Sequence, residues 1–228
     1  MKTLNDYFSK IYCINLDRRT DKYEQCLEEF EKIKITVERI SAIDGIQHFK
    51  TGIHKNAGAY GLLLTNIKII EEARLNNYKN ILILEDDVKF IENFNEKFNS
   101  KIDSLPNNWN LLYLGGNNQF NIGKFNLVTG DTNFVITKEN YKTLDYELCK
   151  TTWTQTTHAV AINSNFYNTI MFGISRNFEY PIDNIYCILQ QEGCNAYTFL
   201  PSLALQRPSF SDIENCFCDH NISNENNF

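Results

Sequence analysis

Short runs of consecutive apolar residues alternate along this chain with longer stretches in which apolar residues recur every three or four positions. The first pattern is typical of buried strands, and the second is typical of helices with one apolar face. We therefore expect strands at 10–16, 36–40, 81–84, 111–114, 158–162 and 197–200. Helices are expected at 21–33, 58–75, 165–172 and 181–191, with another suggested by the spacing of Phe90, Phe94, Phe98 and Ile102.

The alternation of strands and helices predicts an α/β fold with a doubly wound, mostly parallel sheet and a mixed C-terminal half. Gly115-Gly116 is expected to end the fourth strand. The stretch 117–155 is expected to form a long loop with short strands, such as one at 134–136. We expect one domain over 1–220 and a disordered polar tail at 221–228.

Charge and composition exclude several classes of function. The net charge is −6, and no block of five or more basic residues occurs. Binding to a nucleic-acid backbone or to an anionic membrane surface requires clustered Lys and Arg, so neither partner is expected.

No apolar run approaches the length of a membrane span, and the first ten residues contain no apolar signal segment. We therefore expect no transmembrane helix and a reducing, cytoplasmic setting. The 7 cysteines are mostly placed within apolar patterns, as expected for free buried thiols. The spacing of the 7 cysteines matches no structural zinc motif. Cys216-x-Cys218-Asp219-His220 is their only cluster, and a metal role is the minor alternative for it.

An acidic turn follows the most apolar strand of the chain. Ile81–Leu84 leads directly into Glu85-Asp86-Asp87. Ligands of open α/β sheets bind outside the carboxyl ends of strands, and carboxylate oxygens suit Mg²⁺ or Mn²⁺. The turn is thus a candidate metal site, and the alternative is a solvated acidic turn after a core strand.

Phosphate binding would need to use this turn, because the chain contains neither of the glycine-rich phosphate motifs, G-x-x-x-x-G-K-[ST] or G-x-G-x-x-G. A cation held by the turn could neutralise a diphosphate instead. The first strand ends at Asn15, close to Arg18 and Arg19, and arginine suits phosphate contacts. The alternative for the two arginines is a surface pair bound to Asp17 or Asp21.

Several short motifs together resemble glycosyltransferase family 25, the group of lipooligosaccharide and collagen galactosyltransferases. In chain order they are 14–19 (INLDRR), 42–45 (AIDG), 58–62 (GAYGL), 84–88 (LEDDV), 157–162 (THAVAI) and 181–183 (PID). The resemblance covers roughly residues 9–210, and it rests on the order and spacing of the motifs more than on any one of them.

The resemblance implies a glycosyltransferase-A-like fold, a UDP-sugar donor such as UDP-galactose or UDP-glucose, Mn²⁺ (or Mg²⁺) and inversion at the anomeric carbon. Carried over by position, Asn15, Arg18 and Arg19 would line the nucleotide pocket, and Asp44 would lie near the uracil or ribose. In the acidic turn Asp87 would bind the metal, with Asp86 and Glu85 supporting the metal or the ribose.

An inverting transferase needs one general base to deprotonate the acceptor hydroxyl. Asp183, in the first turn of the 181–191 helix, is the first candidate, although a carboxylate there also stabilises the helix dipole. His158 is the second candidate, and its apolar neighbours favour a hydrogen-bonded core histidine instead. The chain has Thr65-Asn66 where many family members carry a Ser-His pair, which leaves donor choice and activity open.

The sequence thus predicts a metal-dependent inverting glycosyltransferase that moves galactose or glucose from a UDP-sugar to a glycan or protein hydroxyl. A catalytically inactive relative that binds nucleotides or glycans is the main alternative. A two-metal phosphodiesterase is the third, but it would need further carboxylates where the other strands end in Asn15 and Gly115.

Overall fold

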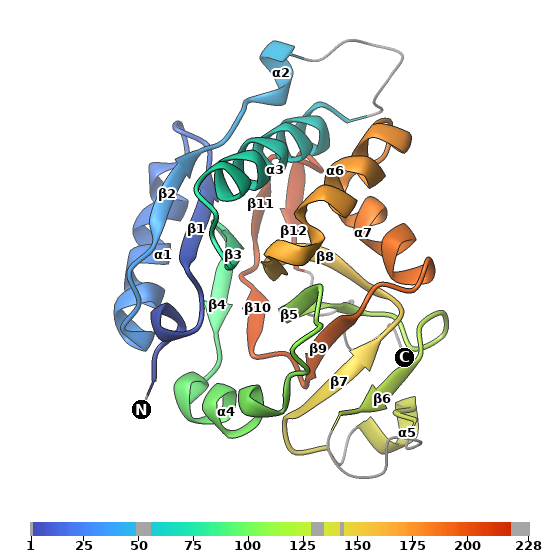
Figure 1. Ribbon diagram of the computed structural model, residues 1–228. Coiled ribbons are helices and arrows are strands. Elements are labelled where there is room, and N and C mark those ends of the chain that lie inside the picture. Colours follow the sequence, from blue (N-terminus) through green and yellow to red (C-terminus); the bar gives the residue numbers. More distant parts are fainter. Residues whose placement is uncertain (1, 49–55, 129–134, 142–143, 220–228) are drawn as a thin grey trace.

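The computed structural model describes residues 2–48, 56–128, 135–141 and 144–219 (Figure 1). Within them, an eight-stranded sheet has the order β2-β1-β3-β8-β5-β9-β7-β6. Its strands are β1 (Lys10–Asn15), β2 (Glu38–Ser41), β3 (Asn80–Glu85), β5 (Leu111–Asn118), β6 (Phe125–Leu127), β7 (Glu147–Thr151), β8 (Thr154–Asn163) and β9 (Ala196–Leu200). The expected disordered tail lies outside the described residues.

Six of these strands run in one direction, and β8 and β7 run in the other. The pairs β1–β2, β1–β3 and β5–β9 are parallel. The pairs of β8 with β3 and β5, and of β7 with β9 and β6, are antiparallel. The predicted α/β class and mostly parallel sheet are confirmed. One consequence matters for the site: β8 starts at the edge where β1 and β3 end.

Helices cover both faces of the sheet (Figure 1). Helices α1 (Thr20–Ile33) and α4 (Phe94–Lys101) pack on one face, and α3 (Ala57–Leu75), α6 (Tyr167–Arg176) and α7 (Ile182–Gln191) pack on the other. Shorter helical segments are α2 (Gly45–His48), α5 (Lys138–Tyr141) and 3₁₀ turns at Leu4–Asp6, Ile102–Ser104 and Ser164–Phe166. None of the helices in the described ranges is long and apolar enough to span a bilayer.

The alternation of side chains along each strand explains this three-layer arrangement. Leu82 and Leu84 of β3 belong to the core on the α1–α4 face, and Ile81 and Ile83 belong to the core on the α3–α6–α7 face. A strand buried on both faces needs an unbroken apolar run. The 81–84 run therefore places β3 in the interior of the sheet, with its carboxyl end at the centre of one edge.

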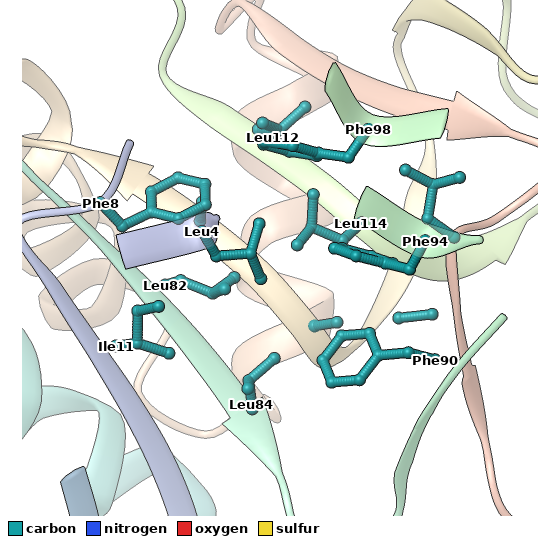
Figure 2. Packing of buried hydrophobic residues seen from close by; sticks show 14 of the residues in the cluster. Leu4, Phe8, Ile11, Leu82, Leu84, Phe90, Phe94, Phe98, Leu112 and Leu114 are labelled. Carbon is teal, nitrogen blue, oxygen red and sulfur yellow. The ribbon is translucent and has the colours of Figure 1, made fainter. Parts of the chain in front are cut away.

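The predicted helix through Phe90, Phe94, Phe98 and Ile102 is only partly right. Phe90 belongs to a short strand, β4 (Val88–Phe90), which pairs with β10 (Ala204–Gln206) outside the main sheet. Helix α4 starts at Phe94. Figure 2 shows Phe90, Phe94 and Phe98 packed in one cluster with Leu112 and Leu114. The spacing by four arises from this shared cluster, since Phe90 reaches it from a strand rather than from the helix.

Two strands are longer than the sequence indicated. β5 continues through Gly115-Gly116 to Asn118, and β8 starts at Thr154 instead of His158. The extra residues pair with one another around a bulge, with Asn117 opposite Gln155 and Asn118 opposite Thr154. These residues are polar, so the sequence did not predict that they pair. The periodicity of apolar residues indicates which side chains are buried, not which backbone groups form hydrogen bonds. Of the strand expected at 134–136, Val135 forms an isolated bridge to Asn126, and Phe134 lies outside the described residues.

The helices expected at 21–33, 58–75 and 181–191 agree with α1, α3 and α7 to within one residue, whereas the one expected at 165–172 is α6, Tyr167–Arg176. A 3₁₀ turn precedes α6, and the side chain of Asn163 caps this turn by accepting a hydrogen bond from the amide of Asn165. Pro181 is the residue before α7, one position outside the helix rather than in its first turn.

The aromatic cluster under α4 generates a stability prediction. Phe98 is fully buried and packs against Phe94 and Phe199. Phe98→Ala should lower the free energy of unfolding by about 3–5 kcal/mol because it leaves a cavity in a packed core. Phe172→Ala is the matched control, because Phe172 is exposed. This substitution should lower the free energy of unfolding by less than about 1 kcal/mol. Urea unfolding measures both, and equal losses would contradict the described core.

Candidate functional site

A cavity of about 920 Å³ opens at the carboxyl ends of β1 and β3. This is within the range of roughly 300–1,000 Å³ typical of ligand pockets. Its walls come from distant parts of the chain: the end of β1, the segment from β2 to α2, the N-terminal turn of α3, the acidic turn after β3, the start of β8, the start of α7, and the segment 206–215. Most of the predicted site residues line it, namely Asn15, Arg18, Asp44, Glu85, Asp86, Asp87 and Asp183.

Asp86 is held by partners on β1 and α1. The Asn15 side-chain amide donates a hydrogen bond of 2.7 Å to its carboxylate, and the Lys22 ammonium lies 3.5 Å away. Lys22 is only 7% exposed, which is unusual for lysine. Burial raises the pKa of Asp86, while Lys22 and Asn15 act in the opposite direction. The ion pair with Lys22 makes Asp86 a supporting residue of the turn more than an open ligand.

Glu85 points toward β8, where the Thr157 hydroxyl donates a hydrogen bond of 2.7 Å to its carboxylate. Burial, together with the nearby charge of Asp87, raises the pKa of Glu85 to about 8. Asp87 lies toward β10: its carboxylate is 3.4 Å from the Gln206 side-chain amide, and its carbonyl accepts a hydrogen bond of 2.7 Å from the Arg207 amide. In the described residues, the three carboxylates thus point to three different partners and do not meet at one point.

Asp183 faces the same cavity from the first turn of α7. Burial raises the pKa of its carboxyl group, although the Asn184 amide donates a hydrogen bond of 2.9 Å to it. The charge of Asp183 also contributes to the raised pKa of Glu85, so the two carboxylates influence each other across the cavity. A carboxylate with a raised pKa is a stronger base than an ordinary one.

A bulge in β8 decides where Thr157 and His158 point. Thr156 has a φ of 66°, a left-handed conformation that is rare for a β-branched residue. The register with β5 shifts at this point, which turns Thr156 and Thr157 toward the cavity. Such strained positions are concentrated at functional sites.

The structure does not bring His158 to the cavity. It is 2% exposed, and its Nε2 lies 3.2 Å from the Ala204 carbonyl oxygen. A carbonyl can only accept, so Nε2 donates to it, and Nδ1 forms a hydrogen bond of 3.1 Å with the Thr156 hydroxyl. This arrangement matches the core-histidine alternative.

Arg18 and Arg19 share a partner that the sequence did not indicate. Arg18 forms ion pairs with Asp44 and, at 3.1 Å, with Asp212. Arg19 forms ion pairs with Asp212 and, at 3.0 Å, with Asp21, and it does not line the cavity. The surface alternative for the pair thus holds for Arg19 and Asp21. Arg18 is the arginine that faces the cavity.

The 42–45 motif forms one wall of the cavity because it packs closely on α3. A Cβ on Gly61 would lie 2.3 Å from the carbonyl oxygen of Ile43, so only glycine allows this approach. The Thr65 hydroxyl accepts a hydrogen bond of 2.9 Å from the Ile43 amide. Its neighbour Asn66 is fully buried, donates to the Leu62 carbonyl and does not line the cavity. The Thr65-Asn66 pair therefore supports the wall from behind.

Three residues of the site were missed by sequence reasoning: Lys22, Arg207 and Asp212. Lys22 lies on a helix whose other polar residues are exposed or half-buried, and Arg207 donates to the backbone carbonyls of Asp86 and Val88, at 3.5 and 3.2 Å. Asp212 reaches its arginines across more than 190 residues of sequence. No local pattern distinguishes these side chains from solvated ones.

Comparisons with known proteins were made on sequence and structure. A family model described as "Glycosyltransferase family 25 (LPS biosynthesis protein)" matches residues 8–177. The chain is 28% identical over 162 residues to "Inactive glycosyltransferase 25 family member 3" of Homo sapiens, which covers 62% of this chain and 27% of that protein. It is 31% identical over 133 residues to "Procollagen lysyl hydroxylase and glycosyltransferase" of Acanthamoeba polyphaga mimivirus, covering 46% and 15%. The chain thus spans about a quarter or less of these relatives.

Two of the similar solved structures are described as glycosyltransferases. One is involved in the glycosylation of the major capsid of PBCV-1, with a TM-score of 0.37 and 13% identity over 75% of this chain and 67% of that one. Another is a Drosophila galactosyltransferase 7 complexed with manganese, UDP-Gal and xylobiose, with a TM-score of 0.38 and 10% identity over 94% and 72%. Structural likeness at this level carries no argument about chemistry. The family model, in contrast, matches most of the chain. This match shows that the chain belongs to glycosyltransferase family 25.

Proposed function

We propose that the cavity binds a UDP-sugar with Mn²⁺ or Mg²⁺ and transfers the hexose, galactose or glucose, with inversion to a hydroxyl of a glycan or protein. The observation that carries this proposal is the shared cavity itself. It brings the acidic turn, Arg18 and Asp183 together in a volume suited to a nucleotide-sugar. Family membership supports the reaction class.

The carboxylates that line the cavity are suitable ligands for a hard divalent cation. Glu85, Asp87 and Asp183 offer carboxylate oxygens to the cavity, and such ligands favour Mg²⁺ and Mn²⁺ over thiophilic metals. The raised pKa values of Glu85 and Asp183 reflect negative charge that burial penalises. Asp87 would hold the cation, with Glu85 in support. When bound, the cation would neutralise the diphosphate and stabilise it as a leaving group.

The opposite wall provides groups suited to the nucleotide. Arg18 presents a guanidinium at the cavity, and Asp44 beside it offers acceptors for a ribose or uracil. The N-terminal turn of α3, with Ala57 and Gly58 at the cavity, adds the positive end of a helix dipole. Asn15 is already bonded to Asp86 and to Arg39, so its role is to orient the turn.

Asp183 is suited to deprotonating the acceptor. Its Oδ2 or Oδ1 would take the hydroxyl proton while the acceptor oxygen attacks the anomeric carbon, and the bond from that carbon to the UDP oxygen breaks on the opposite side. Attack from that side inverts the configuration. The other candidate base, His158, has both ring nitrogens engaged in the core.

The alternative of an inactive binding protein is favoured by the names of mammalian relatives, the human one among them, which call those proteins inactive or probably inactive. Asn66 does not favour it, because this residue lies behind the cavity wall. Incubation with a panel of UDP-sugars and Mn²⁺ separates the two functions. The proposed enzyme releases UDP in the presence of acceptor or water, whereas an inactive relative binds UDP without turnover.

The ionisation of Glu85 generates a pH prediction. Its pKa is about 8 in the folded chain and near 4.5 in the unfolded chain, so the folded state binds the proton more tightly. Stability is therefore lost as the pH rises from about 4.5 to about 8. In chelator, the parent should lose free energy of unfolding relative to Glu85→Gln across this range, and Mn²⁺ should reduce the loss. Urea unfolding at several pH values measures this, and parallel curves would refute it.

Asp87 should carry the metal dependence of nucleotide binding. UDP with Mn²⁺ should raise the melting temperature of the parent, because a ligand specific to the folded state stabilises it by about 2.7 kcal/mol at a hundredfold excess over Kd. Asp87→Asn should abolish most of this shift. Asp103→Asn, at an exposed site, is the matched control and should keep it. An unchanged shift in Asp87→Asn would rule out the assignment.

Asp183 should act on transfer and not on donor binding. Asp183→Asn should retain UDP-sugar affinity and lose transfer by roughly 10²–10⁴-fold, the usual contribution of a general base. Glu96→Gln removes an acidic group from the first turn of α4, away from the cavity, and controls for the helix dipole. Similar losses of stability in both variants with no selective loss of transfer would favour the dipole role.

A further inference from the structure

The hairpin at the C-terminal end of the described chain gathers three metal-ligating side chains. Strands β11 (Ser209–Ser211) and β12 (Cys216–Cys218) pair in antiparallel fashion. Cys216 and Cys218 are two apart on a strand, so their side chains share one face. Their sulfur atoms lie 3.5 Å apart, and the Cys218 sulfur lies 3.2 Å from a carboxylate oxygen of Glu214 in the turn.

The turn conformation brings Glu214 back over β12. Asn215 has a φ of 53°, and its amide donates a hydrogen bond of 2.8 Å to the Ser211 carbonyl. The Glu214 amide donates to the Ser211 hydroxyl at 3.1 Å. The ligand atoms of Glu214, Cys216 and Cys218 all lie within 4.8 Å of one another, and no other group of three does so among the residues searched.

We propose that Cys216, Cys218 and Glu214 bind a thiophilic divalent cation of the Zn²⁺ class, with the fourth position left to water or another ligand. Tetrahedral Zn²⁺ with Zn–S bonds of about 2.3 Å holds two thiolates about 3.8 Å apart, so the observed sulfur separation requires only a small adjustment. Two thiolates and one carboxylate also differ in kind from the oxygen-only set of the cavity, which favours a different metal.

The other cysteines of the chain do not compete for this role. Cys13, Cys26, Cys149 and Cys187 are buried in the core, and Cys194 is partly exposed. Cys216 is exposed and Cys218 is partly exposed, and neither belongs to the apolar clusters of the core. The placement of these two cysteines close to Glu214 is therefore better explained by binding of a metal than by packing in a core.

The proposed metal site lies on a hairpin that also forms part of the cavity wall. Its turn, from Asp212 to Asn215, lines the cavity, and the Ile213 carbonyl accepts a hydrogen bond of 2.6 Å from Asn56 at the start of α3. A Cβ on Gly58 would lie 2.8 Å from the Ile213 Cα, so the turn rests directly on that helix. A cation across Glu214 and β12 would fix the turn that presents Asp212 to Arg18 and Arg19. The metal site itself does not depend on the proposed function.

Titration of the reduced full-length chain with Co²⁺ tests the site, because thiolate–cobalt charge transfer gives a near-ultraviolet band that carboxylate ligands cannot give. The parent should show this band, and Zn²⁺ should displace Co²⁺ and remove it. Cys216→Ser and Cys218→Ser should each weaken binding by at least the roughly 10–100-fold seen when a supporting partner of a metal ligand is lost. Glu214→Gln should weaken binding while keeping the band at saturation.

Cys194→Ser is the matched control and should bind Co²⁺ as the parent does, because Cys194 lies outside the hairpin. Melting curves without metal confirm that the variants fold, as expected for substitutions on an exposed hairpin. The proposal is overturned if the reduced parent gives no thiolate–cobalt band, or if Cys216→Ser and Cys218→Ser both bind Co²⁺ with the affinity and the band intensity of the parent. A failure of UDP to bind would leave this result unchanged, so the two proposals can fail separately.

Discussion

The site depends on one constraint: negative charge must be accommodated where a fully buried strand reaches the edge of the sheet. Glu85, Asp86 and Asp87 follow β3 directly, and burial raises the pKa of the first two. Donors from four other segments surround them: the side-chain amide of Asn15, the ammonium of Lys22, the hydroxyl of Thr157 and the side-chain amide of Gln206. These donors offset the charge only in part, which is why we assign a cation to the cavity.

The fold supplies these donors through its topology. The antiparallel insertion of β8 between β3 and β5 starts that strand beside the acidic turn, and the bulge at Thr156 aims Thr157 at Glu85. Packing on both faces of β3 fixes the turn in place. Figure 2 shows Leu82 and Leu84 of β3 in the packing on one of these faces. The last described segment then passes back over the site, where β10 pairs with β4 and the β11–β12 hairpin covers the arginines.

Much of the fold was predictable from the sequence because burial leaves a periodic pattern. The strand at 81–84, the helix that became α3 and the acidic turn followed from that pattern, and Asp183 was placed at the start of α7 correctly. The role of Phe90 was not predictable, because a strand residue and a helix residue can reach the same cluster with helical spacing. Polar strand ends, such as Thr154–Thr157 in β8, were missed for lack of an apolar signal.

The site was less predictable than the fold, because its remaining parts are long-range contacts. Asp212 and Lys22 reach the site only through contacts between segments that are distant in the sequence. His158 is buried and hydrogen-bonded to the Ala204 carbonyl, as its apolar neighbours in the sequence favoured. Family resemblance indicated candidate site positions but not which of them face the cavity. Arg18 and Arg19 illustrate this, since only Arg18 does.

Paramagnetic broadening by Mn²⁺ tests the central claim most directly, because it locates the cation instead of inferring it from stability. In amide spectra of the full chain with UDP, substoichiometric Mn²⁺ should first broaden the signals of Asn15, Glu85–Val88 and Thr157, while those of β6 and β7 stay sharp. Broadening centred on the Cys216–Cys218 hairpin, or uniform weak broadening throughout the chain, would contradict the assignment of a hard cation to the acidic turn.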